Sequence, residues 1–161
     1  MRFRTLNELA EIAVRDGKPI FRVMLEDQAA ESGRTAEREW EKMKQYYGIM
    51  KEAVKKGIAS EGGSRSGLTG GDAKRAFEYA RQADSSLGGD AGAAMAYALA
   101  VSEVNASMGR IVATPTAGSC GVIPGVFVSS QERFGWTDDH MVGGLFCAGA
   151  IGYVIANNSF I

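Results

Sequence analysis

The chain contains few of the residues from which metal centres and nucleophilic sites are built. Its 161 residues include two cysteines, one histidine and three prolines. Cys120 and Cys147 are far apart in the sequence and have no neighbouring histidine or further cysteine to complete a ligand set. We therefore expect that this chain alone builds neither a zinc nor an iron–sulfur site. The same scarcity excludes a disulfide framework and fits a reducing compartment.

Charge is scarce in the second half of the chain. Residues 1–84 hold 30 of the 37 charged residues, and residues 85–161 hold seven. Between Asp90 and Glu132 the charged residues are Glu103 and Arg110. This contrast predicts one helical domain, in which residues 1–84 form charged amphipathic helices and residues 85–161 form a buried Ala/Gly-rich core with an active-site turn.

Several classes of protein are disfavoured by the overall composition. A hydrophobic fraction of 45% is typical of a soluble globular protein, and the net charge of −1 gives no reason to expect nucleic acid or an anionic membrane as partner. The amino-terminal residues begin with charge, and an amphipathic segment follows, so we expect no signal peptide and a cytoplasmic location. The sequence stops after an uncharged run, so we also expect a longer polypeptide or a covering partner.

No segment shows sustained alternation of apolar and polar residues, so we predict an all-α helical bundle. A capping box at Thr5–Glu8 begins the first predicted helix and Gly17 ends it. Pro19 begins the second and Gly33 ends it. Thr35 can cap a long third helix, which carries an apolar packing seam. The seam consists of Trp40, Met43, Tyr47, Met50 and Val54.

Four further helices are predicted after residue 71. Asp72 and Asp90 can cap two of them, and the helix after Asp90, which extends through Met108, is apolar nearly all round and so predicted to be buried on all sides. The remaining two are expected over Gly121–Phe134 and, capped by Thr137, over Met141–Asn157.

The apolar run at residues 141–156 is shorter than the ~20 residues that span a bilayer. We therefore favour a core helix, with a stripe of small residues that admits a neighbouring helix. The stripe consists of Gly144, Ala148, Gly152 and Ala156.

Polar residues gather in a glycine- and proline-punctuated turn that follows the uncharged helix. Buried polar groups must be hydrogen-bonded, so a polar cluster between two apolar segments indicates a site rather than surface. The hydroxyls and backbone N–H groups of residues 113–121 could hold a small polar substrate. The cluster consists of Glu103, Asn105, Ser107, Arg110, Thr114, Thr116, Ser119 and Cys120.

A second polar loop, Ser66–Asp72, precedes a predicted helix. Free N–H groups and the helix dipole favour an anion there, so the loop could cradle a carboxylate. The alternative is an ordinary glycine loop. Its glycine spacing matches neither the phosphate-binding P-loop nor the dinucleotide-binding fingerprint.

Glu103 and Asn105 are two residues apart on a helix, so their side chains point about 200° apart. They cannot serve one small ligand from the same face unless the helix ends between them. The alternative role for Glu103 is a structural ion pair, for example with Arg110.

Two other chemistries have weak support in the sequence. Cys120 near a helix start could be a nucleophile, but it needs a base, and His140 lies in a polar helix start where a solvated role is favoured. A pyridoxal phosphate enzyme needs a Schiff-base lysine, for which Lys74 is the one lysine near a plausible site. We expect neither chemistry.

Several segments, taken in order, resemble one known family. These are SGLTGGDA at 66–73, EVNASMG at 103–109, ATPTAGSCGVIPG at 113–125 and AGAIGYVIANNSFI at 148–161. They are similar to the α subunit, or catalytic domain, of bacterial iron–sulfur-dependent L-serine dehydratase. The resemblance runs along most of the chain.

The resemblance implies a soluble all-helical catalytic domain that converts L-serine to pyruvate and ammonia without pyridoxal phosphate. It implies a 4Fe-4S cluster acting as Lewis acid on the serine hydroxyl. It also implies a β subunit or domain, and we expect a homo- or hetero-oligomer. In the family the cluster ligands lie beyond the matched region, so no metal ligand and no catalytic residue is assigned to this chain. The positions that the resemblance and the local chemistry assign to substrate binding are Thr69, Gly70, Gly71, Asn105, Thr116, Ala117 and Gly118.

One alternative function remains open at this point. The chain could be a non-catalytic helical oligomerisation or binding module that is derived from the same family and packs through its seam or its small-residue stripe.

Overall fold

The computed structural model describes residues 1–60, 62–64, 66–82 and 84–159. Within these ranges it contains helices and no strand, which confirms the predicted all-α class. Glu61 and Arg65, which precede the predicted Ser66–Asp72 loop, and Phe160 and Ile161 of the last resembling segment, lie outside the described residues. The helices are α1 (Leu6–Asp16), α2 (Ile20–Ser32), α3 (Ala36–Ala59), α4 (Asp72–Ala80), α5 (Gly89–Ala106), α6 (Val122–Phe134) and α7 (Asp138–Asn158).

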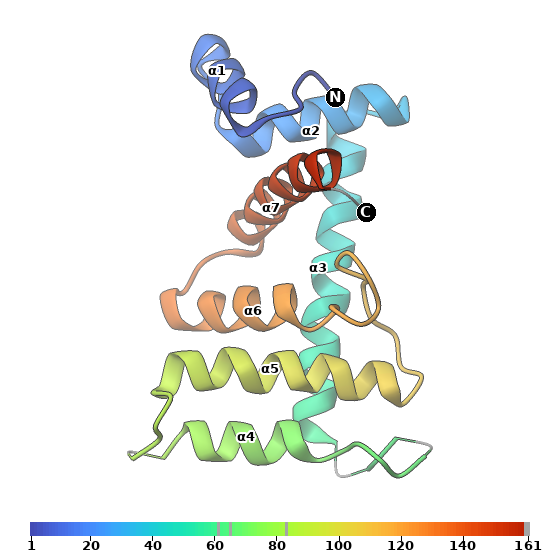
Figure 1. Ribbon diagram of the computed structural model, residues 1–161, viewed down its shortest axis with the longest axis vertical. Coiled ribbons are helices and arrows are strands. Elements are labelled where there is room, and N and C mark those ends of the chain that lie inside the picture. The colour runs from blue at the N-terminus through green and yellow to red at the C-terminus, as the bar shows by residue number, and fades with distance from the viewer. Residues whose placement is uncertain (61, 65, 83, 160–161) are drawn as a thin grey trace. The chain divides into compact units, whose positions relative to one another are not determined.

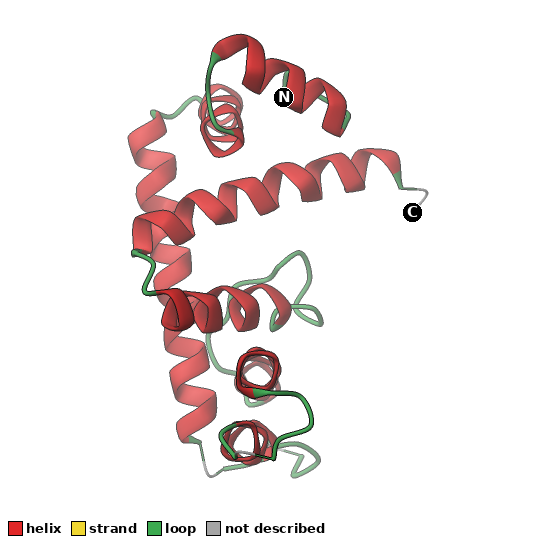
Figure 2. Cartoon of the chain, turned by 90° about the vertical axis from the view of Figure 1, so that its left-hand side faces the viewer, coloured by secondary structure: helices red, strands yellow, loops and turns green. Residues whose placement is uncertain are grey.

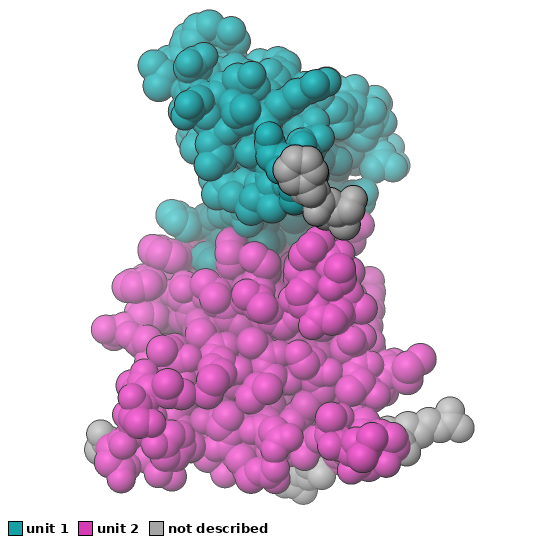
Figure 3. Space-filling model, in the orientation of Figure 1, with its two compact units in different colours: residues 1–45, 138–161 teal, residues 46–137 magenta. Residues whose placement is uncertain are grey.

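The chain divides into two compact units (Figure 3). Unit 1 comprises residues 1–45 and 138–161, and unit 2 comprises residues 46–137. This division does not follow the charge contrast at residue 84, because the charged first half contributes to both units. The prediction of a single domain over the whole chain stays a prediction.

Unit 1 is built from α1, α2, the first part of α3 and α7. The capping box is present: the Glu8 amide donates to Thr5 Oγ1 at 3.2 Å, and Gly17 ends the helix with φ 61°. Helix α2 packs against α7, and Val23 and Val142 are fully buried there. The ring of Trp40 stacks on that of Phe146 with a centroid distance of 5.9 Å. The first part of the predicted seam is therefore a packing surface of unit 1.

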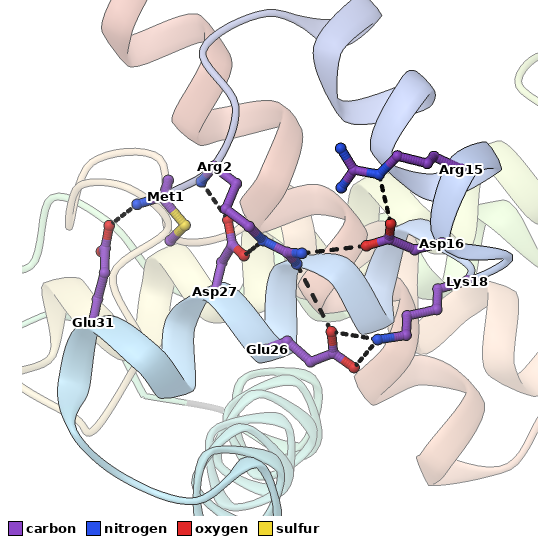
Figure 4. A network of polar contacts seen from close by, with 8 residues as sticks. All are labelled: Met1, Arg2, Arg15, Asp16, Lys18, Glu26, Asp27 and Glu31. Atoms are coloured by element: carbon purple, nitrogen blue, oxygen red, sulfur yellow. Dashed lines mark hydrogen bonds and ion pairs between the residues drawn. The ribbon is translucent and has the colours of Figure 1, made fainter.

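A polar network ties the amino-terminal segment to α2 (Figure 4). Asp27 is almost fully buried, and its carboxylate accepts from the Arg2 guanidinium and, at 2.6 Å, from the Arg2 amide. Arg2 also lies 3.8 Å from Glu26, to which Lys18 donates at 2.8 Å. A buried carboxylate is tolerated only when it is paired in this way.

Helix α7 is longer than predicted, because it begins at Asp138, where two aspartates in the first turn suit the helix dipole. By length and composition it is the one helix of the described residues that could cross a membrane, which is weak support for a membrane span. Its residues Val142 and Phe146 are buried, as expected for a core helix. A Cβ at Gly152 would meet open space, so at this position the predicted stripe is not covered by another helix.

Unit 2 contains a layer of three helices, with α5 between α4 and α6 and the second part of α3 crossing it (Figures 1 and 2). The rest of the predicted seam faces this layer, since Tyr47, Met50 and Val54 are buried. Glycines bring the other helices close to α5. A Cβ at Gly57 of α3 would lie 2.3 Å from the Ala100 carbonyl oxygen.

Helix α5 is not buried on all sides, contrary to the prediction. Its neighbours α3, α4 and α6 leave one face uncovered, where Met95 is 46% and Leu99 37% exposed. The helix also ends at Ala106 instead of Met108.

The aspartates predicted to cap α4 and α5 do not do so. The capping positions belong to Gly71 and Gly88, and each aspartate lies in the first turn, where its charge favours the dipole. Asp72 pairs with Arg75, and Asp90 pairs with Arg133 at 3.0 Å.

The close contact between α5 and the start of α6 gives a test of the packing. A Cβ at Gly121 would lie 2.2 Å from the Ala98 carbonyl oxygen. Gly121→Ala should therefore lower the free energy of unfolding by about 1–3 kcal/mol or more, measured by urea denaturation with circular dichroism. Gly48→Ala is the matched control, because a Cβ there meets nothing within 4 Å and a helix interior gains up to about 1 kcal/mol from alanine. Equal stability of the two variants would contradict this packing.

Candidate functional site

The carboxylate of Glu103, in the last turn of α5, caps the start of α4. Its Oε1 accepts from the amides of Asp72 at 2.7 Å and Ala73 at 3.0 Å, and its Oε2 accepts from the Gly71 amide at 3.1 Å. The side chain is buried, with 8% exposure. Hydrogen bonds to a charged acceptor are stronger than neutral ones, and the α4 dipole favours a negative charge at this end. Among the described residues, Glu103 therefore binds backbone amides, and the alternative of an ion pair with Arg110 is not observed.

Asn105, two residues further along α5, holds a different segment. Its Nδ2 donates to the Ala117 carbonyl oxygen at 3.1 Å. Because α5 lies between α4 and α6, Glu103 and Asn105 point toward opposite neighbours, as the helical spacing predicted. The start of α4, the end of α5 and the start of α6 all lie at one end of the layer (Figure 1).

Helix α5 ends in a Schellman motif, which reverses the chain toward the turn. The Gly109 amide donates to the Val104 carbonyl at 2.8 Å, and the Met108 amide donates to that of Asn105 at 3.0 Å. Met108 occupies the left-handed region with φ 60°, a position that usually requires glycine. A Cβ at Gly109 would lie 2.5 Å from Val104 Cγ1, so the chain passes close to the helix here.

Ser119 organises the turn that precedes α6. Its hydroxyl donates to the Thr114 carbonyl at 3.0 Å and accepts from the Thr116 amide at 3.3 Å. Its own amide donates to Thr116 Oγ1 at 3.2 Å. These bonds leave Thr116, Ala117 and Gly118 exposed at the tip of the turn. The Thr114–Pro115 peptide bond is cis.

The loop before α4 is closed by its own hydrogen bonds. The Ser64 amide donates to the Thr69 carbonyl at 2.6 Å, and the Thr69 amide donates to Ser64 Oγ at 3.3 Å. Gly70 has φ 145°, and a Cβ there would lie 2.4 Å from Gly63 Cα, so only glycine fits. The side chain of Thr69 is exposed.

The structure changes the interpretation of this loop as a carboxylate cradle. The three amides at the start of α4 already bind Glu103, so they are not free donors for an outside anion. The substrate-binding roles of Thr69, Gly70 and Gly71 stay predictions, as do those of Asn105, Thr116, Ala117 and Gly118. What the structure establishes is that Gly71 and Ala117 are both held by the last turn of α5, through Glu103 and Asn105.

The two cysteines belong to different units, and the thiol of Cys120 is enclosed. Cys120 is fully buried, and burial raises the pKa of its thiol, which disfavours the nucleophilic thiolate. Burial also raises the pKa of Cys147, which belongs to the other unit. The described residues contain no cluster of three His, Cys, Asp or Glu side chains suited to a metal ion. Since an iron–sulfur cluster requires several thiolates, the two thiols of this chain do not fit one.

A cavity of about 450 Å³ lies in unit 2, away from the predicted site residues. Its wall includes Phe77, Tyr97 and Glu132, and the Tyr97 hydroxyl donates to Glu132 at 2.6 Å. Burial, together with this carboxylate, raises the pKa of Tyr97. The arrangement satisfies a buried hydroxyl, and no residue predicted to bind substrate lines it.

The fold and the site define an all-helical protein in which one helix, packed between two others, holds two polar segments at its end. The serine dehydratase alpha chain family matches residues 15–161, and the chain belongs to that family.

Named relatives agree with this assignment. The probable L-serine dehydratase alpha chain of Bacillus subtilis (strain 168) is 41% identical over 159 residues, which cover 99% of this chain and 53% of the relative. The L-serine dehydratase alpha chain of Peptoniphilus asaccharolyticus is 33% identical over 151 residues, covering 94% and 52%. The L-serine dehydratase of Streptomyces coelicolor is 35% identical over 164 residues, covering 99% and 35%. The chain thus spans about half the length of the first two relatives. No solved structure matches it.

The sequence did not predict the structural roles of two residues at the site, Glu103 and Ser119. Glu103 was seen as a candidate, but its role as the cap of α4 was not predicted. The signal was its position as the one acidic residue of an uncharged stretch, since a buried charge must have partners. Ser119 carried no comparable signal, because its bonds depend on the conformation of the turn.

The burial of Cys120 can be tested by alkylation. In a Cys147→Ala chain, where Cys120 is the sole thiol, iodoacetamide should react about tenfold or more slowly with the folded protein than with the urea-unfolded protein, because the thiol is enclosed and mainly protonated. Mass spectrometry follows the modified fraction over time. Equal rates in the two states would contradict the buried position.

Proposed function

We propose that this chain supplies the substrate-side part of an L-serine dehydratase, which converts L-serine to pyruvate and ammonia. The observation that carries the proposal is the family match over residues 15–161, together with relatives named for this activity. The site supports it, because three of the segments that resemble the family, at 66–73, 103–109 and 113–125, are held together at the end of α5. Nothing in the structure or the relatives favours the alternative of a non-catalytic oligomerisation module.

The proposed reaction is an elimination. L-serine loses its α-proton and its hydroxyl group, together one molecule of water, to give 2-aminoacrylate. This enamine isomerises to the imine, and water then hydrolyses the imine to pyruvate and ammonia.

We propose that the exposed turn of Thr116, Ala117 and Gly118 receives the serine carboxylate. The turn leads into α6, whose capping position is Gly121 and whose start has no side-chain cap. Of its first amides, that of Val122 donates to the Ser119 carbonyl at 3.3 Å, and Pro124 has no N–H. The positive end of the α6 dipole favours an anion near the turn. The exposed Thr69 hydroxyl is then the acceptor for the serine ammonium group, and Asn105 holds the turn in place. The proton acceptor for the α-carbon is not assigned to a residue of this chain.

We propose that the complete enzyme carries a 4Fe-4S cluster, needs no pyridoxal phosphate and acts in the cytoplasm. The thiols of this chain do not fit the cluster, so its ligands are proposed to come from other polypeptide. The relatives are named alpha chains, which supports a β subunit as partner and an oligomeric enzyme. Exposed apolar side chains on α5 and α6, among them Met95, Leu99 and Val126, offer a surface for such polypeptide.

Reconstitution tests the proposal. This chain is fused to the part of the Bacillus subtilis alpha chain that follows the matched region and is produced anaerobically with that enzyme's β subunit, iron and sulfide. Pyruvate is measured with L-serine as substrate. We expect pyruvate from the fusion and none from this chain alone or from the assembly without it.

The native Bacillus subtilis assembly is the positive control. Pyruvate from that control but none from a folded fusion would contradict the proposed function. Visible absorbance on adding pyridoxal phosphate, with a Schiff base at Lys74, would contradict the cofactor assignment.

A further inference from the structure

We propose that Glu103 is a positioning residue, which fixes the Thr69–Gly71 segment for substrate binding and does not itself exchange a proton with the substrate. The inference rests on the proposed function. It concerns the contacts that we call the Glu103 clamp: the Glu103 carboxylate and the amides of Gly71, Asp72 and Ala73.

The geometry of the clamp makes Glu103 a poor proton acceptor. Both oxygens are engaged, one by two amides and the other by one, at 2.7–3.1 Å. A carboxylate offers about four acceptor positions, so three of them are filled by backbone of the same unit. With 8% exposure the side chain has little access to a ligand, and accepting a proton would weaken the cap of α4.

The clamp connects the polar loop to the helix layer. The hydrogen bonds within described residues 62–69 join near neighbours, such as Ser64 and Thr69. In this part of the chain it is the Gly71 amide that reaches α5, and it does so through Glu103. The position of Thr69, two residues earlier, therefore depends on this carboxylate.

A second side chain completes the arrangement. Asn105 binds the Ala117 carbonyl at 3.1 Å from the opposite side of α5. The separation of the two proposed binding segments is thus set by two side chains on opposite sides of the last turn of one helix. That helix is held by close glycine contacts, at Gly57 of α3 and Gly121 of α6. Loss of the clamp should therefore weaken binding of L-serine more than it slows the chemical step.

Steady-state kinetics of the assembled fusion enzyme distinguish a positioning role of Glu103 from a role as general base. In Glu103→Gln, the amide group that replaces one oxygen meets a backbone N–H, so the loop should shift. We expect the KM for L-serine to rise about tenfold or more while kcat changes less than about threefold. Loss of a general base would instead lower kcat by about 10²–10⁴ with KM unchanged, and that result would overturn the inference.

Two further variants make the measurement specific. Glu103→Asp keeps the charge with a shorter side chain, so its KM should lie between those of the unsubstituted enzyme and Glu103→Gln. If Glu103→Gln does not fold, Glu103→Asp is measured in its place. A raised KM with a nearly unchanged kcat supports the inference, and a lowered kcat with an unchanged KM overturns it. Glu39→Gln is the matched control, because Glu39 is a carboxylate of unit 1 with 4% exposure and accepts from Ser32 and Arg34. It should leave the KM within about twofold.

Hydrogen exchange on the 161-residue chain tests the clamp independently of activity. In Glu103→Gln the amides of Gly71, Asp72 and Ala73 should exchange about tenfold or more faster, with the amides of α6 unchanged. Unchanged exchange at those three positions would overturn the inference. If the fusion without substitutions yields no pyruvate, the proposed function fails, and the exchange result still decides whether Glu103 holds the loop.

Discussion

The structure of the site depends on a single buried carboxylate. Glu103 belongs to a stretch of sequence that is almost without charge, and it lies where the solvent cannot stabilise it. Leaving such a group without partners costs about 3–5 kcal/mol, so the fold must bring donors to it. The donors are the backbone amides at the start of α4, which themselves lack partners within that helix. One contact thus satisfies two groups that would each be costly alone, and it fixes the polar loop as a consequence.

The packing of α5 makes this contact possible. Alanines and glycines along the interfaces with α3, α4 and α6 bring the helix backbones close together, which fixes the axis of α5 and therefore the position of its last turn. Glu103 faces α4 and Asn105 faces the turn before α6 because they are two residues apart on that axis. The Schellman ending at Met108 then directs the chain away from α5 and into the turn. Close packing of small residues fixes α5. The polar side chains at its end then hold the two segments of the site at a defined separation.

Features determined by neighbours in sequence were predictable. The capping box at Thr5, the ends of α1 and α2 at Gly17 and Gly33, and the buried seam of α3 follow from local rules of capping and periodicity. The cap of α4 was not predictable in this way, because Glu103 lies about 30 positions from the amides that it binds, and Asp72 offered a local alternative. The uncovered face of α5 was missed for a related reason. Composition shows that a helix is apolar, but it does not show how many neighbours the fold provides.

The central claim is that Glu103 occupies the amides at the start of α4 while the substrate carboxylate binds at the turn before α6. A crystal structure of the assembled enzyme with L-serine, determined under conditions that prevent turnover, tests it most directly. The account predicts the serine carboxylate at Thr116–Gly118, with Glu103 still bound to Gly71, Asp72 and Ala73. A serine carboxylate bound to those three amides, with Glu103 displaced from them, would contradict it.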